Sequence, residues 1–212
     1  LVSLALWAPW RPAPQPAPPL RLSAELGAAA SLATDFGPAA ILSPDRRLLA
    51  FVASRGAEGR PQLHLRRLEQ LDAAALAETE DARDPFFSPD GEWIAFFADG
   101  RLKKILADGG PVMDVAAAPD NRGGVWAGDD TIIYAPVPAS PLVQVPAAGG
   151  KTTPVSTLVE KKRERTHRWP SVLPDGKTVL VTVGSVEHPD DYDDARIESL
   201  RLGTGERHVV IE

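Results

Sequence analysis

Residues 85–105, PFFSPDGEWIAFFADGRLKKI, decide the fold because they combine a tight turn with a long apolar run. In Ser-Pro-Asp-Gly (88–91), Ser suits turn position i, Pro has the fixed φ of position i+1, and Asp and Gly suit the last two positions. The run WIAFFA (93–98) is aromatic and apolar, which is typical of a strand. This stretch therefore predicts a type I turn that leads into a buried strand.

The same turn-and-strand pattern recurs along the chain, with its turn aspartates 45, 39 and 46 residues apart. Its four copies are LSPDRRLLAFVA (42–53), FSPDGEWIAFFA (87–98), WAGDDTIIYAPV (126–137) and LPDGKTVLVTVG (173–184). We expect the turns to be built by Pro44, Asp45, Pro89, Asp90, Gly91, Asp129, Pro174, Asp175 and Gly176. Two copies depart from the pattern, since Arg46 replaces the turn glycine and the third copy has Gly-Asp-Asp (128–130).

Each unit supplies further strand candidates after the first apolar run. They lie at 62–68 and 74–79, 101–107 and 111–117, 141–147 and 153–159, and 195–202 and 207–212. With the run before each turn, every unit has four strands, which is typical of a propeller blade. A helical solenoid is the alternative, but no unit has an apolar stripe at helical spacing. We therefore predict an all-β propeller of four-stranded antiparallel blades, about four in number, with repeats near 37–80, 84–117, 122–159 and 167–212.

These repeats resemble the TolB-like family of six-bladed propellers. From Leu22 onward the chain also resembles the extracytoplasmic C-terminal region of bacterial membrane-anchored serine/threonine protein kinases. The stretches that carry the resemblance are 85–105, PAAGGKTTPVSTL (146–158), HRWPSVLPDGKTVLVTV (167–183) and DDARIESLRLGTGER (193–207). The resemblance implies an incomplete six-bladed ring, and it makes RLSAELG (21–27) a candidate closing strand that lacks its partner blade.

The N-terminal segment fits the order of such kinases, in which a catalytic domain, a membrane helix and a stalk precede the propeller. Residues 1–10, LVSLALWAPW, are apolar and long enough for half of a membrane span. We expect them to end a transmembrane helix, with a signal-peptide remnant or a short buried strand as alternatives. Residues 11–20 are proline-rich and predict an extended stalk. The expected location is membrane-anchored, with the propeller extracytoplasmic (periplasmic).

Composition excludes several classes of function. The net charge of −6 argues against nucleic acid as a partner, because phosphate contacts need a basic face. The chain has no cysteine, so disulfides, thiolate catalysis and cysteine-based zinc sites are excluded.

Motifs for catalysis are incomplete. Asp-Phe-Gly (35–37) matches the magnesium-binding triplet of kinases but has no catalytic loop before it. Gly-Gly-Lys-Thr (149–152) lacks the earlier glycine of a phosphate-binding loop and fits a hairpin turn. No Gly-x-Ser-x-Gly elbow occurs, and the histidines at 64, 167, 188 and 208 lack metal-ligand spacing. We therefore expect no catalytic residue, no metal and no cofactor in this chain.

Two charged runs have open interpretations. Residues 187–194, EHPDDYDD, hold five carboxylates and could bind Ca²⁺, although their spacing matches no calcium loop. Residues 160–168, EKKRERTHR, are basic and could dock an anionic partner. We expect both runs to be solvated loops.

The first strand of each blade lines the channel of a propeller, and loops at one rim usually form the binding face. Arginine and tryptophan are typical anchors there. The candidate ligand-binding residues are Arg122, Trp126, His167, Arg168 and Trp169. The alternative is that Trp126 and Trp169 only fill the space between blades.

The function predicted by this combination is a non-catalytic sensor that binds an unknown extracytoplasmic ligand or protein and relays binding to a kinase domain. Two alternatives stay open. One is a periplasmic TolB-like docking scaffold. The other is the propeller of a prolyl-oligopeptidase-like peptidase without its hydrolase domain.

Overall fold

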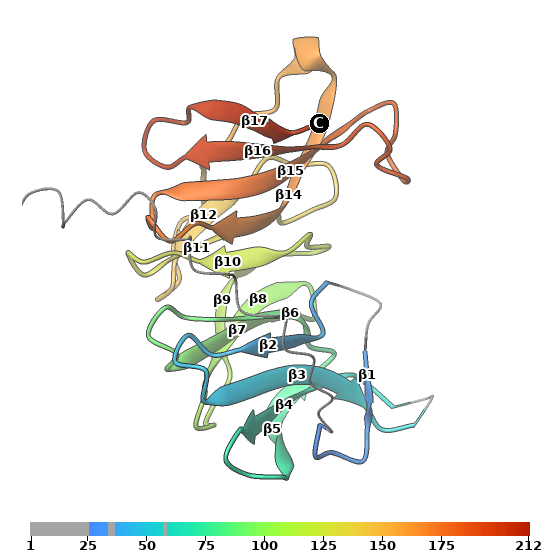
Figure 1. Cartoon of the computed structure of the whole chain (residues 1–212), viewed down its shortest axis with the longest axis vertical. Helices are drawn as coiled ribbons and strands as arrows, with labels where there is room; N and C mark the ends of the chain where they lie inside the picture. Colours follow the sequence, from blue (N-terminus) through green and yellow to red (C-terminus); the bar gives the residue numbers. More distant parts are fainter. Residues whose placement is uncertain (1–25, 34–36, 57–58) are drawn as a thin grey trace, which may run out of the picture.

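The computed structural model describes residues 26–33, 37–56 and 59–212. These residues form four antiparallel sheets that lie one after another, in chain order, along the long axis of the molecule (Figure 1). We name the sheets blade A (31–80), blade B (83–117), blade C (124–154) and blade D (164–211). Each blade is a meander in which consecutive strands pair, as hairpin-connected sequence predicts.

Blade A differs from the others because its second strand has two partners on one side. Strand β3 pairs with β2 over Leu49–Phe51 and with β1 at Ala53 and Ser54. Strands β1 and β2 therefore lie end to end along the same edge of β3. The bounds are β1 (Ser31–Leu32), β2 (Ala40–Leu42), β3 (Leu48–Ser54), β4 (Gln62–Arg67) and β5 (Ala73–Glu80).

Blades B, C and D each have four strands, which confirms the predicted all-β class of four-stranded antiparallel units. Blade B contains β6 (Arg83–Phe87), β7 (Trp93–Ala98), β8 (Arg101–Leu106) and β9 (Met113–Ala117). Blade C contains β10 (Gly124–Trp126), β11 (Thr131–Tyr134), β12 (Val143–Pro146) and β13 (Thr153–Pro154). A short 3-10 turn, η1 (Glu160–Lys162), precedes blade D with β14 (Glu164–Val172), β15 (Thr178–Ser185), β16 (Arg196–Arg201) and β17 (Arg207–Ile211).

The strand predicted at 153–159 is wrong in length, because β13 ends at Pro154. Beyond β13 the Val155 N–H still donates to the Leu142 carbonyl at 3.0 Å, but the Leu142 N–H donates to the Ser156 hydroxyl at 2.9 Å. A side-chain acceptor thus takes the place of a backbone carbonyl at this point, and the regular ladder ends.

The predicted turn residues lie in the four loops that join the first and second strands of the blades. The carbonyls of Ser43, Ser88 and Leu173 accept hydrogen bonds of 2.8–2.9 Å from the N–H three residues later, as in a type I turn. That third residue adopts a positive φ, which glycine accepts readily at Gly91 (77°). In the two departing copies, Arg46 and Asp130 take the same left-handed conformation with φ near 60°.

The core consists of layers between neighbouring blades. Successive residues of a strand point to opposite faces, so Phe96 packs toward blade A and Phe97 toward blade C. Blades C and D enclose a third layer that includes Ile133, Val181 and Leu200. Because each central strand is covered on both faces, it reads as a continuous apolar run.

The interpretations of the N-terminal segment fall mainly outside the described residues. The membrane-helix end (1–10) and the stalk (11–20) lie wholly outside them, as do the first five residues of the closing strand (21–27). Leu26 and Gly27 are not in a strand, although the Gly27 carbonyl accepts a 2.9 Å hydrogen bond from the Ala73 N–H. Within the part of the chain that the structure describes, no helix is long and apolar enough to cross a membrane.

Candidate functional site

The first strands of blades C and D lie side by side and bring three of the five candidate residues together. Arg122 lies two residues before β10, and its carbonyl accepts a 2.9 Å hydrogen bond from the Trp169 N–H. Arg168 and Trp169 lie within β14, which begins at Glu164 and not at His167 as the repeat predicts. The meeting point of the two strands is therefore formed by Arg122, Arg168 and Trp169.

A bulge in β14 directs the two neighbouring side chains differently. The register of β14 against β15 shifts between Arg168 and Ser171, and Trp169 has φ 51°. As a result Trp169 is 45% exposed, whereas Arg168 is only 3% exposed. Strand β6 has the same device, with a register shift after Arg83 and φ 47° at Asp84. The bulge is thus a repeated feature of these first strands, which re-aims a side chain as bulges commonly do.

Arg168 contacts two aromatic rings, whose centroids lie 5.8 Å from each other. Its guanidinium carbon lies 4.5 Å from the ring centroid of Tyr192 and 5.2 Å from that of Trp169. Its Nε donates to the Thr166 hydroxyl at 3.2 Å, and its Nη2 donates to the Pro138 carbonyl at 2.8 Å. Stacking and these hydrogen bonds fix the guanidinium plane in one orientation.

A pocket of about 250 Å³ opens beside Arg168. It is lined by three arginines, Arg122, Arg165 and Arg168, together with Pro138, Asp190 and Tyr192. Burial lowers the pKa of Arg168, and the nearby Arg122 and Arg165 guanidiniums lower it further. Arginine nevertheless stays protonated in proteins, so the pocket has a positive wall.

Sequence reasoning missed Arg165, Asp190 and Tyr192, because it treated the charged runs 160–168 and 187–194 as solvated loops. In the structure the two runs contact each other: Arg163 pairs with Glu187, and Arg165 Nη1 donates to the Pro189 carbonyl at 3.0 Å. Their opposite charges were the signal that could have predicted this contact.

Trp126 is not part of the pocket. It lies at the other end of β10 from Arg122, is 5% exposed, and packs in the core between blades B and C. Its Nε1 donates to Asp130 at 3.2 Å. This position fits the alternative that Trp126 fills the space between blades, and its assignment as a ligand-binding residue stays a prediction.

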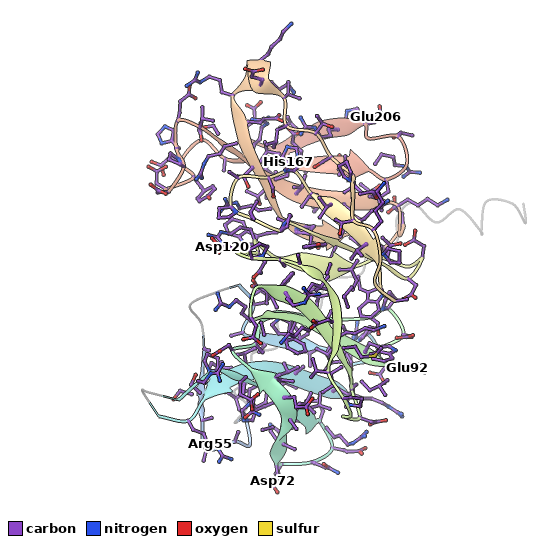
Figure 2. The ribbon with its side chains drawn as sticks, turned by 180° about the vertical axis from the view of Figure 1, so that it is seen from behind. Arg55, Asp72, Glu92, Asp120, His167 and Glu206 are labelled. Carbon is purple, nitrogen blue, oxygen red and sulfur yellow. The ribbon has the colours of Figure 1, made fainter. Side chains whose placement is uncertain are left out.

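His167 is also removed from the pocket, since its side chain is fully buried within blade D (Figure 2). Its Nδ1 lies 2.7 Å from the hydroxyl of Ser156 in blade C, and its Nε2 lies 2.6 Å from Arg207. Burial, followed by the neighbouring Arg207 charge, lowers the pKa of His167 from 6.5 to about 4. A neutral, fully buried imidazole with both nitrogens engaged fits a structural role, and the assignment of His167 as a ligand contact stays a prediction.

An ion network surrounds His167. The Glu164 carboxylate accepts hydrogen bonds from Arg196 at 2.6 Å and from Arg207 at 2.8 Å, and Glu198 accepts one from Arg196 at 2.6 Å. Burial by itself raises the pKa of Glu164, but hydrogen bonds from Arg207 and the Val159 N–H outweigh it and lower the pKa. Three strands of blade D are therefore joined by paired buried charges.

The acidic run contains a small group of potential metal ligands. Ligand atoms of His188, Asp191 and Asp193 lie within 4.8 Å of one another. The Asp191 carboxylate already accepts hydrogen bonds from the Asp193 N–H at 3.1 Å and lies 3.0 Å from His188 Nδ1. Hydrogen bonds within the loop account for this arrangement, and the expectation of no metal stays a prediction.

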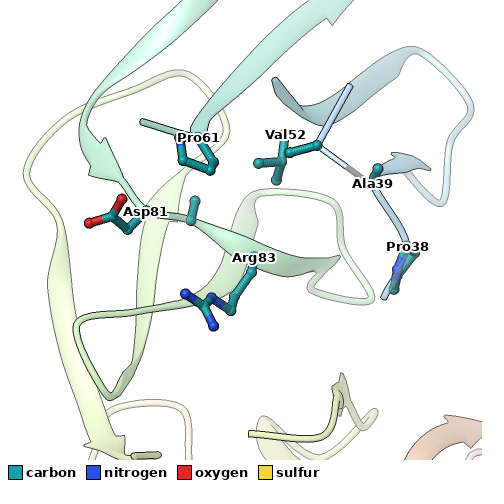
Figure 3. Close-up of a pocket in the computed structure, with 8 residues that line it drawn as sticks. Pro38, Ala39, Val52, Pro61, Asp81 and Arg83 are labelled. Carbon is teal, nitrogen blue, oxygen red and sulfur yellow. The ribbon is translucent and has the colours of Figure 1, made fainter. Parts of the chain in front are cut away.

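A second, smaller pocket lies between blades A and B (Figure 3). Its volume is about 90 Å³, and Pro38, Ala39, Val52 and Pro61 form most of its wall. The Asp81 carboxylate at its edge is paired with Arg60. This pocket is small and mainly apolar, so it offers less chemistry than the arginine pocket.

The motifs that resemble phosphate-binding loops do not form a site. Residues 149–152 follow β12 and precede β13, with φ 87° at Gly149 and 128° at Gly150, and Gly149 N–H donates to the Pro146 carbonyl at 2.8 Å. This is the predicted hairpin turn. Asp35 and Phe36 of the Asp-Phe-Gly triplet lie outside the described residues.

No protein-family model matches this chain, and no curated protein matches it. Solved structures do match. TolB from Acinetobacter baumannii superposes with a TM-score of 0.65 at 14% identity over 82% of this chain. Putative TolB from Agrobacterium tumefaciens gives 0.64 at 16% identity over 79% of this chain. The chain has the fold of a β-propeller.

The propeller spans 43% of the first TolB chain and 62% of the second, so it covers less than two thirds of either. An acylaminoacyl peptidase also matches, with a TM-score of 0.54 at 15% identity over 86% of this chain and 32% of the peptidase chain. At such identities the likeness shows the fold and nothing about activity.

Proposed function

We propose that this propeller is a non-catalytic binding domain, and that it is the extracytoplasmic sensor of a bacterial membrane-anchored serine/threonine protein kinase. The observation that carries the binding role is the arginine pocket, where the Arg168 guanidinium contacts the rings of Trp169 and Tyr192. Rigid aromatic and arginine anchors are typical of binding surfaces. The kinase connection rests on the resemblance of the repeats and on the apolar and proline-rich segments 1–10 and 11–20.

The surroundings of Ser156 and His167 support binding over hydrolysis. These two side chains and Glu164 form a serine–histidine–carboxylate arrangement, with the imidazole Nε2 3.4 Å from the carboxylate. Catalysis would need an exposed hydroxyl. Ser156 is only 6% exposed, and its hydroxyl already accepts the Leu142 N–H, so this arrangement has no access to a substrate.

A periplasmic docking scaffold is the second candidate, and the structural likeness to TolB propellers favours it. The propeller of a peptidase is the third, and the likeness to acylaminoacyl peptidase favours it. In all three candidates the propeller binds another molecule. They differ in the domain that is attached to the propeller: a kinase domain, no catalytic domain, or a hydrolase domain.

Binding at the rim is tested by titrating the purified chain with a panel of short peptides and cell-envelope metabolites, with the indole N–H resonances followed by NMR. We expect a panel member to shift the Trp169 indole signal saturably. Trp169→Ala should abolish this binding, whereas Leu71→Ala, which removes an 82% exposed side chain from blade A, should leave it unchanged. Binding that is equal in both variants, or no saturable binding, contradicts the proposal.

The sensor role is tested in cells that express the full-length gene product. We expect Trp169→Ala to change the phosphorylation of an intracellular kinase domain, and Leu71→Ala to leave it at the wild-type level. A gene product without a kinase domain overturns the sensor role and leaves the scaffold or, if a hydrolase domain is present, the peptidase propeller.

A further inference from the structure

The arginine pocket has three lining arginines and one lining carboxylate, so its side chains carry a net positive charge. Arg122 has a carboxylate partner, since its Nη1 lies 2.6 Å from Asp120. Among residues 26–33, 37–56 and 59–212, no carboxylate oxygen lies within 4.0 Å of the Arg165 or Arg168 guanidinium nitrogens. These two arginines donate to neutral oxygens instead, those of Pro189, Thr166 and Pro138.

Arg168 is the unusual member of this group, because only 3% of its surface is exposed. A buried charge costs free energy unless an opposite charge compensates for it. In the described part of the chain the nearest compensation comes from the faces of two aromatic rings and from polar oxygens. The site therefore has the electrostatics of an anion-binding pocket, with three arginines against one lining carboxylate, that of Asp190.

The Trp169 ring, which contacts Arg168 beside the pocket, is also held in place in advance. Trp169 keeps its left-handed backbone through the hydrogen bond to the Arg122 carbonyl, and a Cβ on Gly123 would lie 3.1 Å from the Trp169 ring. Gly123 thus allows the indole to lie close against blade C. Since the guanidinium and the ring are already ordered, a ligand loses less of its binding energy to ordering side chains.

From this geometry we infer that the pocket binds a carboxylate group of a peptide, with the adjoining apolar part of the peptide on the exposed Trp169 ring. The inference rests on the proposed binding role of the rim and specifies its ligand. A planar guanidinium matches the two oxygens of a carboxylate. The volume of about 250 Å³ suits a single terminal residue or acidic side chain.

Asp190 lines the same pocket and carries the charge that a carboxylate ligand would oppose. Its like charge weakens binding, so replacing it with a neutral residue of the same shape should strengthen binding. The inference therefore predicts a variant that binds more tightly than the wild type, which a partly unfolded protein would not do.

The experiment titrates the whole chain with N-acetyl-leucine while the Arg168 Nε–H and Trp169 Nε1–H resonances are followed by NMR. We expect saturable shifts with a Kd on the order of 1 mM. N-acetyl-leucinamide, which lacks the carboxylate, should bind at least about tenfold more weakly, and added salt should weaken binding of the acid. N-acetyl-glutamic acid α-amide, with only a side-chain carboxylate, distinguishes an acidic side chain from a peptide terminus as the source.

Variants separate the pocket from the rest of the protein. Arg168→Gln should weaken binding by about tenfold or more. Arg165→Gln, at a partly buried residue, should also weaken binding, and it serves as the test if the buried Arg168 substitution prevents folding. Arg201→Gln, on the exposed part of blade D, is the matched control. Asp190→Asn should tighten binding a few-fold, whereas Asp129→Asn, in the turn between β10 and β11, should not.

Several outcomes overturn the inference: equal binding of acid and amide, tighter binding of inorganic phosphate than of the carboxylate, or no effect of both pocket arginines. Binding of a ligand that has no acidic group, if it is lost in Trp169→Ala, would overturn the carboxylate assignment and leave the proposed binding role intact. Absence of any Trp169-dependent ligand would overturn both.

Discussion

The backbone N–H of Trp169 donates a 2.9 Å hydrogen bond to the carbonyl of Arg122, which joins β14 to the segment just before β10 beside the arginine pocket. This one bond holds a tryptophan in a left-handed conformation that side chains rarely adopt. It also places the indole against Gly123 and Arg168, so the packing of two blades and the shape of the pocket depend on the same contact.

Gly123→Ala should destabilise the protein and disturb the pocket. Gly123 has φ 82°, and a Cβ there would lie 3.1 Å from the Trp169 ring and 3.2 Å from its Cα. We expect a loss of about 1–3 kcal/mol in the free energy of unfolding, measured by urea denaturation. Gly128→Ala is the matched control, because nothing lies within 4 Å of its added Cβ. Equal stability of the two variants would contradict the role assigned to Gly123.

The stability of blade D should fall in mild acid because of His167. The folded-state pKa near 4 lies below the usual 6.5, so the unfolded state binds more protons between these values. The stabilisation is therefore complete above pH 6.5 and is lost as the pH falls toward 4, with a slope of at most about 1.4 kcal/mol per pH unit. Thermal unfolding as a function of pH measures this slope. His167→Gln should flatten it, and His208→Gln, whose side chain is 69% exposed, should leave it unchanged.

Glu164→Gln should be strongly destabilising. The substitution removes one of the two buried carboxylates that Arg196 and Arg207 share, and leaves Glu198 to face both guanidiniums. Breaking a buried ion pair from one side costs about 3 kcal/mol or more. Chemical denaturation checks the magnitude, with Glu206→Gln on an exposed loop as the comparison. A loss below about 1 kcal/mol would show that the network contributes little.

Asp84→Asn should stabilise the protein at neutral pH. Burial raises the pKa of Asp84, and its Oδ1 has no hydrogen-bond partner among the described residues, while Oδ2 accepts from Asn121 at 2.6 Å. A raised folded pKa means that stability decreases as the pH rises from about 4 through that pKa. Removing the charge should add about 1 kcal/mol at pH 7 and abolish this part of the pH dependence, as measured by calorimetry. An unchanged or lower melting temperature relative to Asp129→Asn would contradict the prediction.

Local patterns predicted the strands and turns well because they depend on neighbouring residues. The Ser-Pro-Asp-Gly turn at 88–91 forms the expected hydrogen bond, and WIAFFA forms β7. The strand predicted at 153–159 is too long, because the hydroxyl of Ser156 and not a backbone carbonyl accepts the Leu142 N–H. The same hydroxyl contacts His167. That replacement depends on residues far away in the sequence.

The candidate site was predicted in part for the same reason. Arg122, Arg168 and Trp169 meet at the rim, but Trp126 and His167 are buried. Residue type indicates which side chains are suited to binding, but exposure depends on the bulge in β14 and on the faces of the blades. The sequence could not indicate that Tyr192, from an acidic loop, would cover Arg168.

The amino-acid sequence alone determined the repeat, the turns and the four-stranded units, since these follow from backbone preferences and apolar runs over a few residues. Only the tertiary structure decided which arginine is buried and which charged segments line the pocket. The physical reason is that burial and electrostatic environment arise from contacts between blades, and such contacts join residues that no local pattern connects.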